Sequence, residues 1–182
     1  MQSEHDIGRG KQDFEAAAQE AYPALLRAAT VLCWSRADAE DIVQETMLRA
    51  FKSYGAFRGD SSFFTWAYAI LARTAQAANH AHTRCLPSDY ALGQPQHLPP
   101  VDHAVVLNED ARVLIDAIRS LPARQREMVT LHFLEDEGYA EIAVALAVSV
   151  GTVKATIFEA KATLRSVLAR KGVGRKAPDD VP

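Results

Sequence analysis

A proline-rich segment without helical periodicity divides the 182-residue chain and limits what it can fold into. Residues 85–104 hold four of the eight prolines, and their apolar residues follow no period of three or four. Proline lacks a backbone N–H and does not continue a helix or a central strand, so this segment favours an extended linker. A chain of this length forms one domain or two small ones, and the linker predicts two.

Apolar residues recur every three or four positions on both sides of the linker, which is typical of amphipathic helices. No strand-like alternation appears, so we predict an all-α fold of two small helical domains. Pro23 is expected to break or restart the first helix, and Ser35 or Asp38 to cap the second. The predicted helices cover about 14–32, 38–54, 62–80, 105–120, 123–133, 139–147 and 150–170. The predicted parts are a tail (1–13), a first domain (14–84), the linker (85–104), a second domain (105–170) and a tail (171–182).

Composition excludes several classes of protein. The chain is 48% hydrophobic and 24% charged, which is typical of a folded protein. No apolar run approaches the roughly 18–20 residues that span a bilayer, and the polar N-terminus has no secretory signal. Two cysteines are too few for a disulfide framework. We therefore expect a reduced, cytoplasmic protein with no membrane insertion, no cofactor and no metal.

The charge is unevenly distributed. The formal net charge of −3 argues mildly against a nucleic-acid partner, yet residues 154–176 carry seven basic side chains and one acid, Glu159. Such a stripe can bind phosphates. It can equally be a solvated helix end whose cations complement the helix dipole. Charge alone leaves both interpretations open.

Residues 139–168 contain the strongest motif. Their apolar positions predict two short helices packed across a tight turn, with Ser149 at the N-cap of the second. Gly151 and Thr152 keep the start of that helix small, as entry into the roughly 12 Å wide major groove requires. The alternative is a plain helical hairpin in a bundle core. The motif and the basic stripe together favour DNA binding.

These residues closely resemble the C-terminal domain of extracytoplasmic-function (group 4) sigma factors. The match lies in Leu121-Pro122, Arg124–Glu127, Tyr139–Ala143 and Gly151–Lys154, and residues 38–68 resemble the N-terminal core domain of the same family. The resemblance implies an alternative sigma factor, not itself an enzyme, that recognises −35 and −10 promoter elements and promotes −10 melting. The implied partners are core RNA polymerase (β′ clamp helices and β flap), promoter DNA and an anti-sigma factor.

The second predicted helix has an acidic outer face. Like charges so close together are unfavourable unless a partner neutralises them, although a solvated face is the simpler interpretation. The resemblance instead places polymerase binding on this helix. The implied core-polymerase-binding residues are Asp38, Asp41, Gln44, Glu45 and Arg49.

The loop at 56–62 and the aromatic residues after it form another candidate site. Duplex opening needs aromatic surfaces and a pocket for an extruded base, although the helical period also places Trp66 in the core. Further along, basic and amide side chains form one polar stripe that can meet base edges. The resemblance implies −10 DNA binding by Phe57, Arg58, Asp60, Ser61, Ser62, Phe64, Trp66, Arg73, Gln76, His80 and Arg84.

The last predicted helix carries the expected −35 site. The helical period turns Val153, Ile157, Ala160 and Leu164 inward and leaves the opposite face for the groove. The implied −35 DNA-binding residues are Arg124, Ser149, Gly151, Thr152, Lys154, Ala155, Thr156, Glu159 and Lys161.

Three departures from the family pattern are visible. The Arg-rich end of the third predicted helix is reduced to Arg73, His80, His82 and Arg84. The turn position usually held by glycine is Ala147, where a left-handed residue costs about 1 kcal/mol. Positions that are often basic are Thr156 and Glu159. Fewer phosphate contacts predict weaker and less salt-sensitive DNA binding.

Two other functions fit parts of the sequence. A metal site or hydrolase could use His80, His82 and Cys85, but the spacing is loose for zinc and no fourth ligand is evident. A stand-alone helix-turn-helix regulator with an N-terminal sensing domain is the other alternative. Binding to core polymerase separates this regulator from a sigma factor, because a regulator would bind DNA alone.

Overall fold

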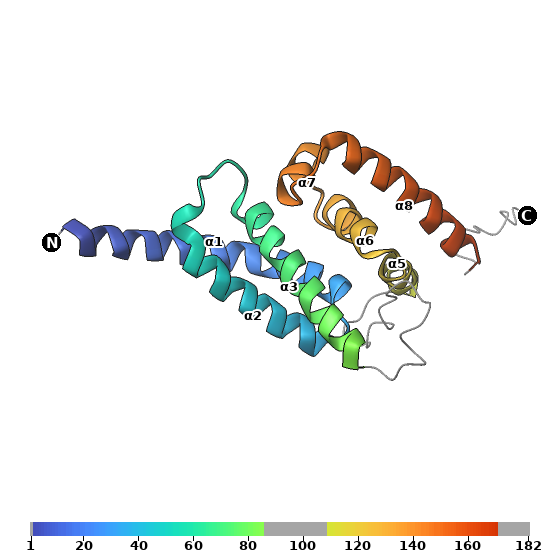
Figure 1. Ribbon diagram of the computed structural model, residues 1–182, viewed down its shortest axis with the longest axis horizontal. Coiled ribbons are helices and arrows are strands. Elements are labelled where there is room, and N and C mark those ends of the chain that lie inside the picture. The colour runs from blue at the N-terminus through green and yellow to red at the C-terminus, as the bar shows by residue number, and fades with distance from the viewer. Residues whose placement is uncertain (1, 86–108, 171–182) are drawn as a thin grey trace, which may run out of the picture.

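The computed structural model of the chain describes residues 2–85 and 109–170, with side chains from Gln12 to His82 and from Ala111 to Arg170. Within these ranges every regular element is helical, which confirms the all-α prediction (Figure 1). The predicted linker lies outside the described residues. The elements are α1 (Gln2–Leu32), α2 (Arg36–Ser53), the short helix η1 (Tyr54–Ala56), α3 (Phe63–Cys85), α5 (Glu109–Arg119), α6 (Ala123–Val129), the π-helical turn η2 (Thr130–Leu134), α7 (Tyr139–Ala145) and α8 (Val150–Arg170).

The first domain is a bundle of α1, α2 and α3, each of which packs against the other two. Leu25, Val43 and Leu71 are fully buried at its centre. α2 begins with the predicted cap, because Ser35 Oγ accepts the Asp38 N–H at 3.1 Å. The Asp38 carboxylate accepts the Ser35 N–H in return at 3.0 Å, which completes a capping box. Local hydrogen bonds therefore fix where this helix starts.

The prediction that Pro23 breaks the first helix is wrong. α1 contains Pro23 and continues to Leu32, and its helical backbone starts at Gln2 rather than at Phe14. A proline inside a helix has no N–H, so the carbonyl four residues earlier loses its hydrogen-bond donor. That residue is Gln19, and both Gln19 and Pro23 are exposed, so water can satisfy the carbonyl.

The second domain consists of α5 to α8. Pro122 separates α5 from α6 as predicted, and α8 covers Val150–Arg170 as predicted. The helix expected over 123–133 is shorter, because α6 ends at Val129 and widens into η2. The helical period of the fourth predicted helix places Leu114 inside, but this residue is 38% exposed. The helical period of α5 thus locates its buried face only approximately.

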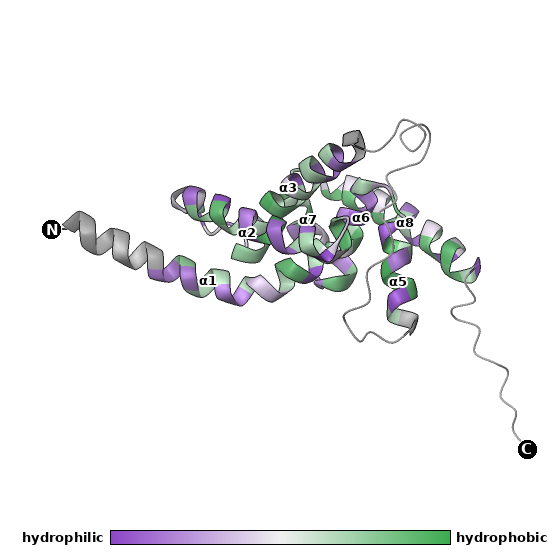
Figure 2. Ribbon diagram, turned by 90° about the horizontal axis from the view of Figure 1, so that it is seen from below, coloured by the Kyte–Doolittle hydropathy of each residue, from purple (hydrophilic) through white to green (hydrophobic). Residues whose placement is uncertain are grey.

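One apolar cluster joins the two domains. It combines Leu25 and Leu71 of the first domain with Met128, Ile142 and Ile157 of the second, all at most 1% exposed. α7 packs directly against α3, and ribbon segments of hydrophobic residues, green in Figure 2, lie on both helices. The sequence predicts two helical domains but gives no sign of this contact.

No described helix is by itself long and apolar enough to cross a membrane; α7 and α8 pass that test only as a pair, bent by 106°. Among the described side chains, no three of His, Cys, Asp and Glu converge in a way that could hold a metal ion. The side chain of Cys85, the third residue of the metal alternative, lies outside this set.

Candidate functional site

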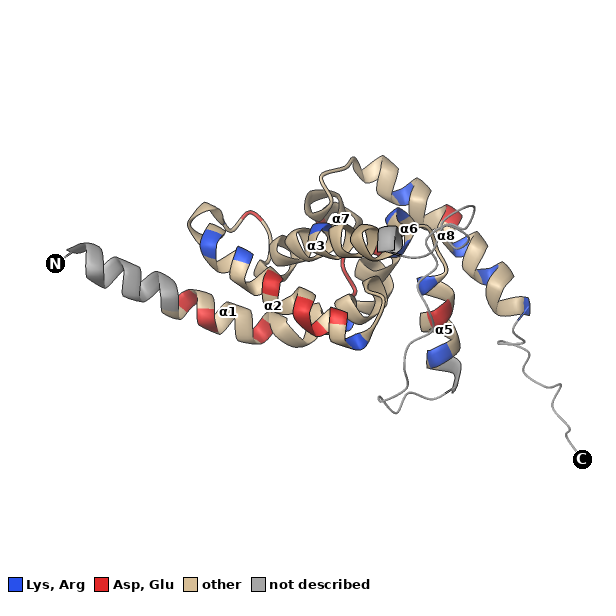
Figure 3. Ribbon diagram, turned by 60° about the horizontal axis from the view of Figure 1, so that its bottom comes forward, with Lys and Arg blue, Asp and Glu red and all other residues tan. Residues whose placement is uncertain are grey.

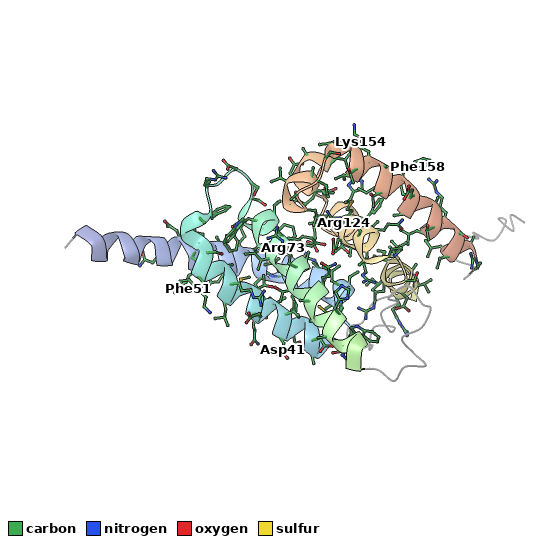
Figure 4. All side chains as sticks on the ribbon, viewed as in Figure 1. Asp41, Phe51, Arg73, Arg124, Lys154 and Phe158 are labelled. Carbon is green, nitrogen blue, oxygen red and sulfur yellow. The ribbon has the colours of Figure 1, made fainter. Side chains whose placement is uncertain are left out.

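The outer face of α2 is the first candidate surface. Asp41 and Gln44 are exposed on it, and Asp41 lies on the side of the bundle away from the second domain (Figure 4). Glu45 and Arg49 form an ion pair at 2.7 Å with spacing i,i+4. Asp38 is occupied in the capping box and serves the helix end. Of the five predicted polymerase-binding residues, Asp41, Gln44 and the Glu45–Arg49 pair therefore form the accessible surface.

The same face of α2 continues into two apolar side chains that the sequence analysis missed. Leu48 is 56% exposed and Phe51 is 50% exposed. The helical period of 38–54 predicts Phe51 inside, but its ring contacts Phe14 edge-on, with ring centroids 5.2 Å apart, and stays half exposed. The spacing 41, 44, 48, 51 places both residues in line with the acidic positions, so a helical projection of α2 alone could have found them. The surface combines negative charge with an apolar end.

The loop after η1 leads into an aromatic cluster at the start of α3. The Phe57 and Trp66 ring centroids lie 5.1 Å apart, and those of Phe63 and Trp66 lie 5.7 Å apart. All three residues are half-buried. Trp66 packs against the core, as its helical position predicts, and it remains partly exposed. The rings of Phe57, Phe63 and Trp66 pack together where α3 begins.

The residues of the loop between η1 and α3 have different structural roles. Gly59 has φ +75°, a conformation that favours glycine. Arg58 and Asp60 are exposed and lie 3.5 Å apart. Ser62 Oγ accepts the Thr65 N–H at 3.0 Å and thereby caps α3. Arg58 and Asp60 are the loop residues whose charged groups face solvent.

The predicted polar stripe on α3 is present. Arg73, Gln76 and His80 are exposed, while the side chain of Arg84 lies outside the described set. Arg73 and Gln76 also line a cleft whose other wall includes Arg124 of the second domain. Figure 4 shows Arg73 and Arg124 on the sides of α3 and α6 that approach each other. The stripe is therefore accessible along one edge and approached by the second domain along the other.

Arg124, predicted as a −35 contact, is half exposed and makes two polar contacts within the second domain. Its guanidinium donates to Glu127 at 3.1 Å and to the carbonyl of Leu146, the C-cap of α7, at 3.0 Å. Burial raises the pKa of Glu127, and the hydrogen bond from Arg124 opposes that shift. Arg124 thus holds the end of α7 and neutralises a buried carboxylate on the α3 side.

The turn between α7 and α8 is built as predicted. Ala147 has φ +52°, the left-handed conformation expected there. Ser149 Oγ accepts the Thr152 N–H at 3.0 Å and caps α8, so its hydroxyl serves the helix start. The four inward residues of α8 are buried as predicted: Val153, Ile157, Ala160 and Leu164. This turn fixes the direction in which α8 leaves the domain.

The outer face of α8 presents a mixed surface. Most of the residues predicted to lie there are exposed, namely Gly151, Thr152, Lys154, Ala155 and Glu159, whereas Thr156 is half-buried. The Lys161 amine lies 5.2 Å from the Phe133 ring centroid in a cation–π contact. Phe158, which the sequence analysis overlooked, is 75% exposed on this face (Figure 4). An aromatic ring this exposed on a helix beside a basic side chain is a candidate contact residue.

The two surfaces carry opposite charge. Figure 3 shows Asp and Glu gathered on α1 and α2, whereas Lys and Arg predominate along α8. The molecule therefore presents an acidic face in one domain and a basic helix in the other. The formal net charge of −3 for the whole chain does not reveal this separation of charge.

Comparison with known proteins agrees with this geometry. Residues 12–82 match the family model described as Sigma-70 region 2, and residues 111–164 match Sigma-70, region 4. The ECF RNA polymerase sigma-E factor of Haemophilus influenzae is 35% identical over 137 residues, covering 70% of this chain and 72% of that protein. The sigma-E factor of Escherichia coli K12 is 32% identical over 134 residues, covering 68% and 70%.

The chain belongs to the extracytoplasmic-function group of the sigma-70 family. In this sigma factor α1–α3 form region 2 and α5–α8 form region 4. The fold is similar to that of the sigma factor RpoE in complex with the anti-sigma factor NepR from Bartonella quintana. That match has a TM-score of 0.71 at 23% identity and covers 90% of this chain and 99% of that one. CnrH in complex with the cytosolic domain of CnrY gives a TM-score of 0.64 at 21% identity, covering 88% and 90%.

The left-handed Ala147 in the turn of region 4 gives a stability prediction. Replacing Ala147 with glycine removes a backbone penalty, and we expect the free energy of unfolding to rise by about 1 kcal/mol. Ala162→Gly in the exposed middle of α8 is the matched control and should lower it by about 1 kcal/mol. Urea unfolding followed by circular dichroism measures both. Equal effects of the two substitutions would contradict the backbone assignment.

Proposed function

We propose that this chain is an alternative sigma factor that binds core RNA polymerase and directs promoter-specific initiation of transcription. The observation that carries the proposal is the match of both regions, 12–82 and 111–164, in one chain whose α2 and α8 leave contact surfaces exposed. The protein acts where RNA polymerase works, in the cytoplasm. It catalyses no reaction itself, since its task is to bind and position polymerase and DNA.

The α2 face is the proposed polymerase contact, made with the clamp helices of the β′ subunit. Asp41 and Gln44 offer a carboxylate and an amide for charged or polar partners, with Glu45 beside them. Leu48 and Phe51 add exposed apolar area at the end of this face. Such a combination of apolar area and charge suits a specific protein interface, because apolar burial supplies affinity and charge supplies orientation. In region 4, a contact with the β flap completes the polymerase interface.

The loop and aromatic cluster of region 2 are the proposed −10 site. Half-buried rings such as Phe57 and Trp66 can stack on unpaired bases without refolding of the bundle, because neighbouring rings already hold them. Extruding a base demands unstacking energy that such contacts repay. Arg73, Gln76 and His80 then supply charge and hydrogen bonds along the strand.

The exposed face of α8 is the proposed −35 site. Gly151 and Ala155 let the helix approach the groove, and Lys154 can contact a phosphate or a guanine. Phe158 can pack on a thymine methyl group, the apolar feature that distinguishes this base in the major groove. Glu159 repels phosphates unless it accepts a hydrogen bond from a cytosine amino group. The face therefore contributes base discrimination more than general affinity.

An anti-sigma factor is a further proposed partner. The titles of two similar structures name sigma factors in complex with anti-sigma factors, NepR and the cytosolic domain of CnrY. The exposed apolar residues Leu48 and Phe51 of α2 and Phe158 of α8 give such a partner surfaces to cover in both regions. Covering them would block polymerase and DNA contacts together.

Run-off transcription on a promoter library tests the proposed function. Purified chain added to core polymerase should produce transcripts from a subset of promoters that share −35 and −10 sequences. Core polymerase alone and the chain alone are the controls. Sequence-specific DNA binding by the chain alone, with no stimulation of core polymerase, would instead establish the stand-alone regulator.

Charge reversal on α2 should abolish polymerase binding. Asp41→Lys with Glu45→Lys places two cations where the partner meets acids, and we expect at least a tenfold loss of co-purification with core polymerase. Asp13→Lys with Glu20→Lys makes the same charge change on the exposed side of α1 and should leave binding intact. Circular dichroism checks that both variants keep their helical content. Unchanged co-purification of the α2 variant would refute the assignment.

Substitutions on α8 should alter −35 recognition. Lys154→Ala should weaken promoter binding by about 1–3 kcal/mol if Lys154 contacts a base. Glu159→Arg should strengthen −35 binding in general, because it replaces a repulsion of phosphates with an attraction. Glu159→Gln should relax the preference at one position only if Glu159 contacts a base.

Selection of −35 sequences by the holoenzyme at fixed salt measures these effects. Glu20→Arg, which makes the same charge change on α1, is the control and should bind as the wild type. If none of the α8 variants changes affinity or preference, α8 does not contact the −35 element.

A further inference from the structure

We infer that Phe14 of α1 is a positioning residue for the −10 site. Its ring contacts no DNA but holds in place the aromatic rings that stack on unpaired bases. The inference rests on the proposed function, because it names a residue that this function needs. The −10 residues predicted from the sequence do not include Phe14, which the helical period placed simply on an apolar face.

Phe14 lies at the centre of an aromatic cluster in region 2. Its ring centroid is 5.2 Å from that of Phe51, 5.2 Å from that of Tyr54 and 5.6 Å from that of Phe63. All three pairs are edge-on, with interplanar angles of 67°, 76° and 79°, a favoured arrangement for aromatic rings. One ring of α1 therefore contacts rings from α2, η1 and α3.

Tyr54 and Phe63 connect Phe14 to the rings of the proposed −10 site. The Tyr54 ring stacks on that of Phe57, with centroids 5.9 Å apart and an interplanar angle of 24°. The centroid of Phe63 lies 6.0 Å from that of Phe57 and 5.7 Å from that of Trp66. Phe14 thus acts on Phe57 and Trp66 through one intervening ring.

Burial separates the supporting ring from the rings that can meet DNA. Phe14 is 8% exposed, whereas Tyr54, Phe57 and Trp66 are half-buried. A base stacks only on a ring with an accessible face, so Phe14 is not placed to stack on one. Figure 1 shows α1 passing beside the end of α2, where η1 and the loop begin. A long helix therefore supports the cluster from behind.

The loop between η1 and α3 is attached to the bundle at its two ends. The Phe57 N–H donates to the Tyr54 carbonyl at 2.9 Å. Ser62 Oγ accepts the Thr65 N–H at 3.0 Å. Residues 58–60 between these ends are exposed. The two hydrogen bonds fix where the loop leaves and rejoins the bundle, so the direction of the Phe57 ring depends on the neighbouring rings.

Fixed ring positions matter because a side chain that must become ordered on binding lowers the affinity. Rings that neighbours already hold offer a preorganised surface as soon as a base unpairs. Phe14→Leu keeps an apolar side chain in the core but removes the edge-on contacts. We therefore expect the fold and the polymerase surface to persist while stacking on bases weakens.

Promoter opening by the holoenzyme tests this role on a promoter from the run-off library. In Phe14→Leu, the permanganate reactivity of unpaired −10 thymines should fall about fivefold or more, the equivalent of about one lost stacking contact. Co-purification with core polymerase should be unchanged, because the variant keeps the charged residues Asp41 and Glu45 of the α2 face. Holoenzyme binding to a duplex that carries only the −35 element should also be unchanged.

Two further variants make the comparison specific. Phe14→Tyr keeps the ring and should open the promoter as the wild type does. Tyr22→Leu removes a ring from the same helix, at a residue that is 39% exposed, and should leave opening unchanged. Equal losses in Phe14→Leu and Phe14→Tyr would overturn the role of the ring.

The outcomes separate this inference from the proposed function. Wild-type opening by Phe14→Leu would overturn the inference and leave the proposed function intact. Failure of the wild-type chain to open any promoter with core polymerase would overturn the proposed function itself.

Fluorescence quenching of the free chain tests the same role without DNA. The sequence has two tryptophans, so Trp34→Phe leaves Trp66 as the single one. In that background Phe14→Leu should raise the acrylamide quenching constant of Trp66, because the Tyr54 and Phe63 rings beside it lose their support. Phe14→Tyr should leave the constant unchanged. An unchanged constant in Phe14→Leu, or a loss of helical content by circular dichroism, would show that Phe14 does not specifically position these rings.

Discussion

Burial of apolar side chains between α3 and region 4 is the interaction on which the rest of this structure depends. Each region alone is a small helical unit, and small domains bury too little apolar area to be very stable. Leu71, Met128 and Ile142 are fully buried in a cluster that neither region completes alone. Two small cores thus become one larger core while the regions stay together.

The same contact explains why charged groups lie inside a protein of this size. Arg119 and Arg126 are each 2% exposed, and burying an unpaired guanidinium is strongly unfavourable. Both guanidiniums donate to backbone carbonyls at helix ends and turns, which need donors in any case. Each arginine therefore satisfies acceptors that helix geometry leaves open. Arg119 donates to carbonyls of region 2, so its compensation depends on both regions being in place, whereas Arg126 donates to the carbonyls of Arg119 and Leu121 within region 4.

Much of the fold and part of the candidate site could be predicted because their determinants are local. Ser35 and Ser149 cap the helices that they precede, and Ala147 adopts the left-handed turn that its place between two helices requires. The buried positions of α8 follow from the helical period alone. Each of these features depends on residues within about one helical turn.

The features that escaped prediction depend on distant neighbours. α1 continues through Pro23, where Gln19, whose carbonyl loses its helical donor, is exposed, and Phe51 is 50% exposed although it lies beside the buried face of α2. Arg124 could be placed on a helix but not oriented, because its partners Glu127 and Leu146 come together only through the packing of α6 on the end of α7. The contact between the regions produces no separate pattern of apolar residues in either half of the sequence. A single sequence predicts which side of a helix is apolar, but the tertiary packing determines which element contacts that side.

The composition of α8 limits what this helix, the proposed −35 contact, can bind by itself. Lys154 is the one cation in the first two turns of that helix, and Glu159 follows it on the exposed side. So few phosphate contacts give little affinity for duplex DNA by themselves. When region 2 is held on polymerase and DNA, however, region 4 binds the −35 element as a tethered domain at high effective concentration. The −35 contact then adds specificity to a complex that region 2 and polymerase have already formed.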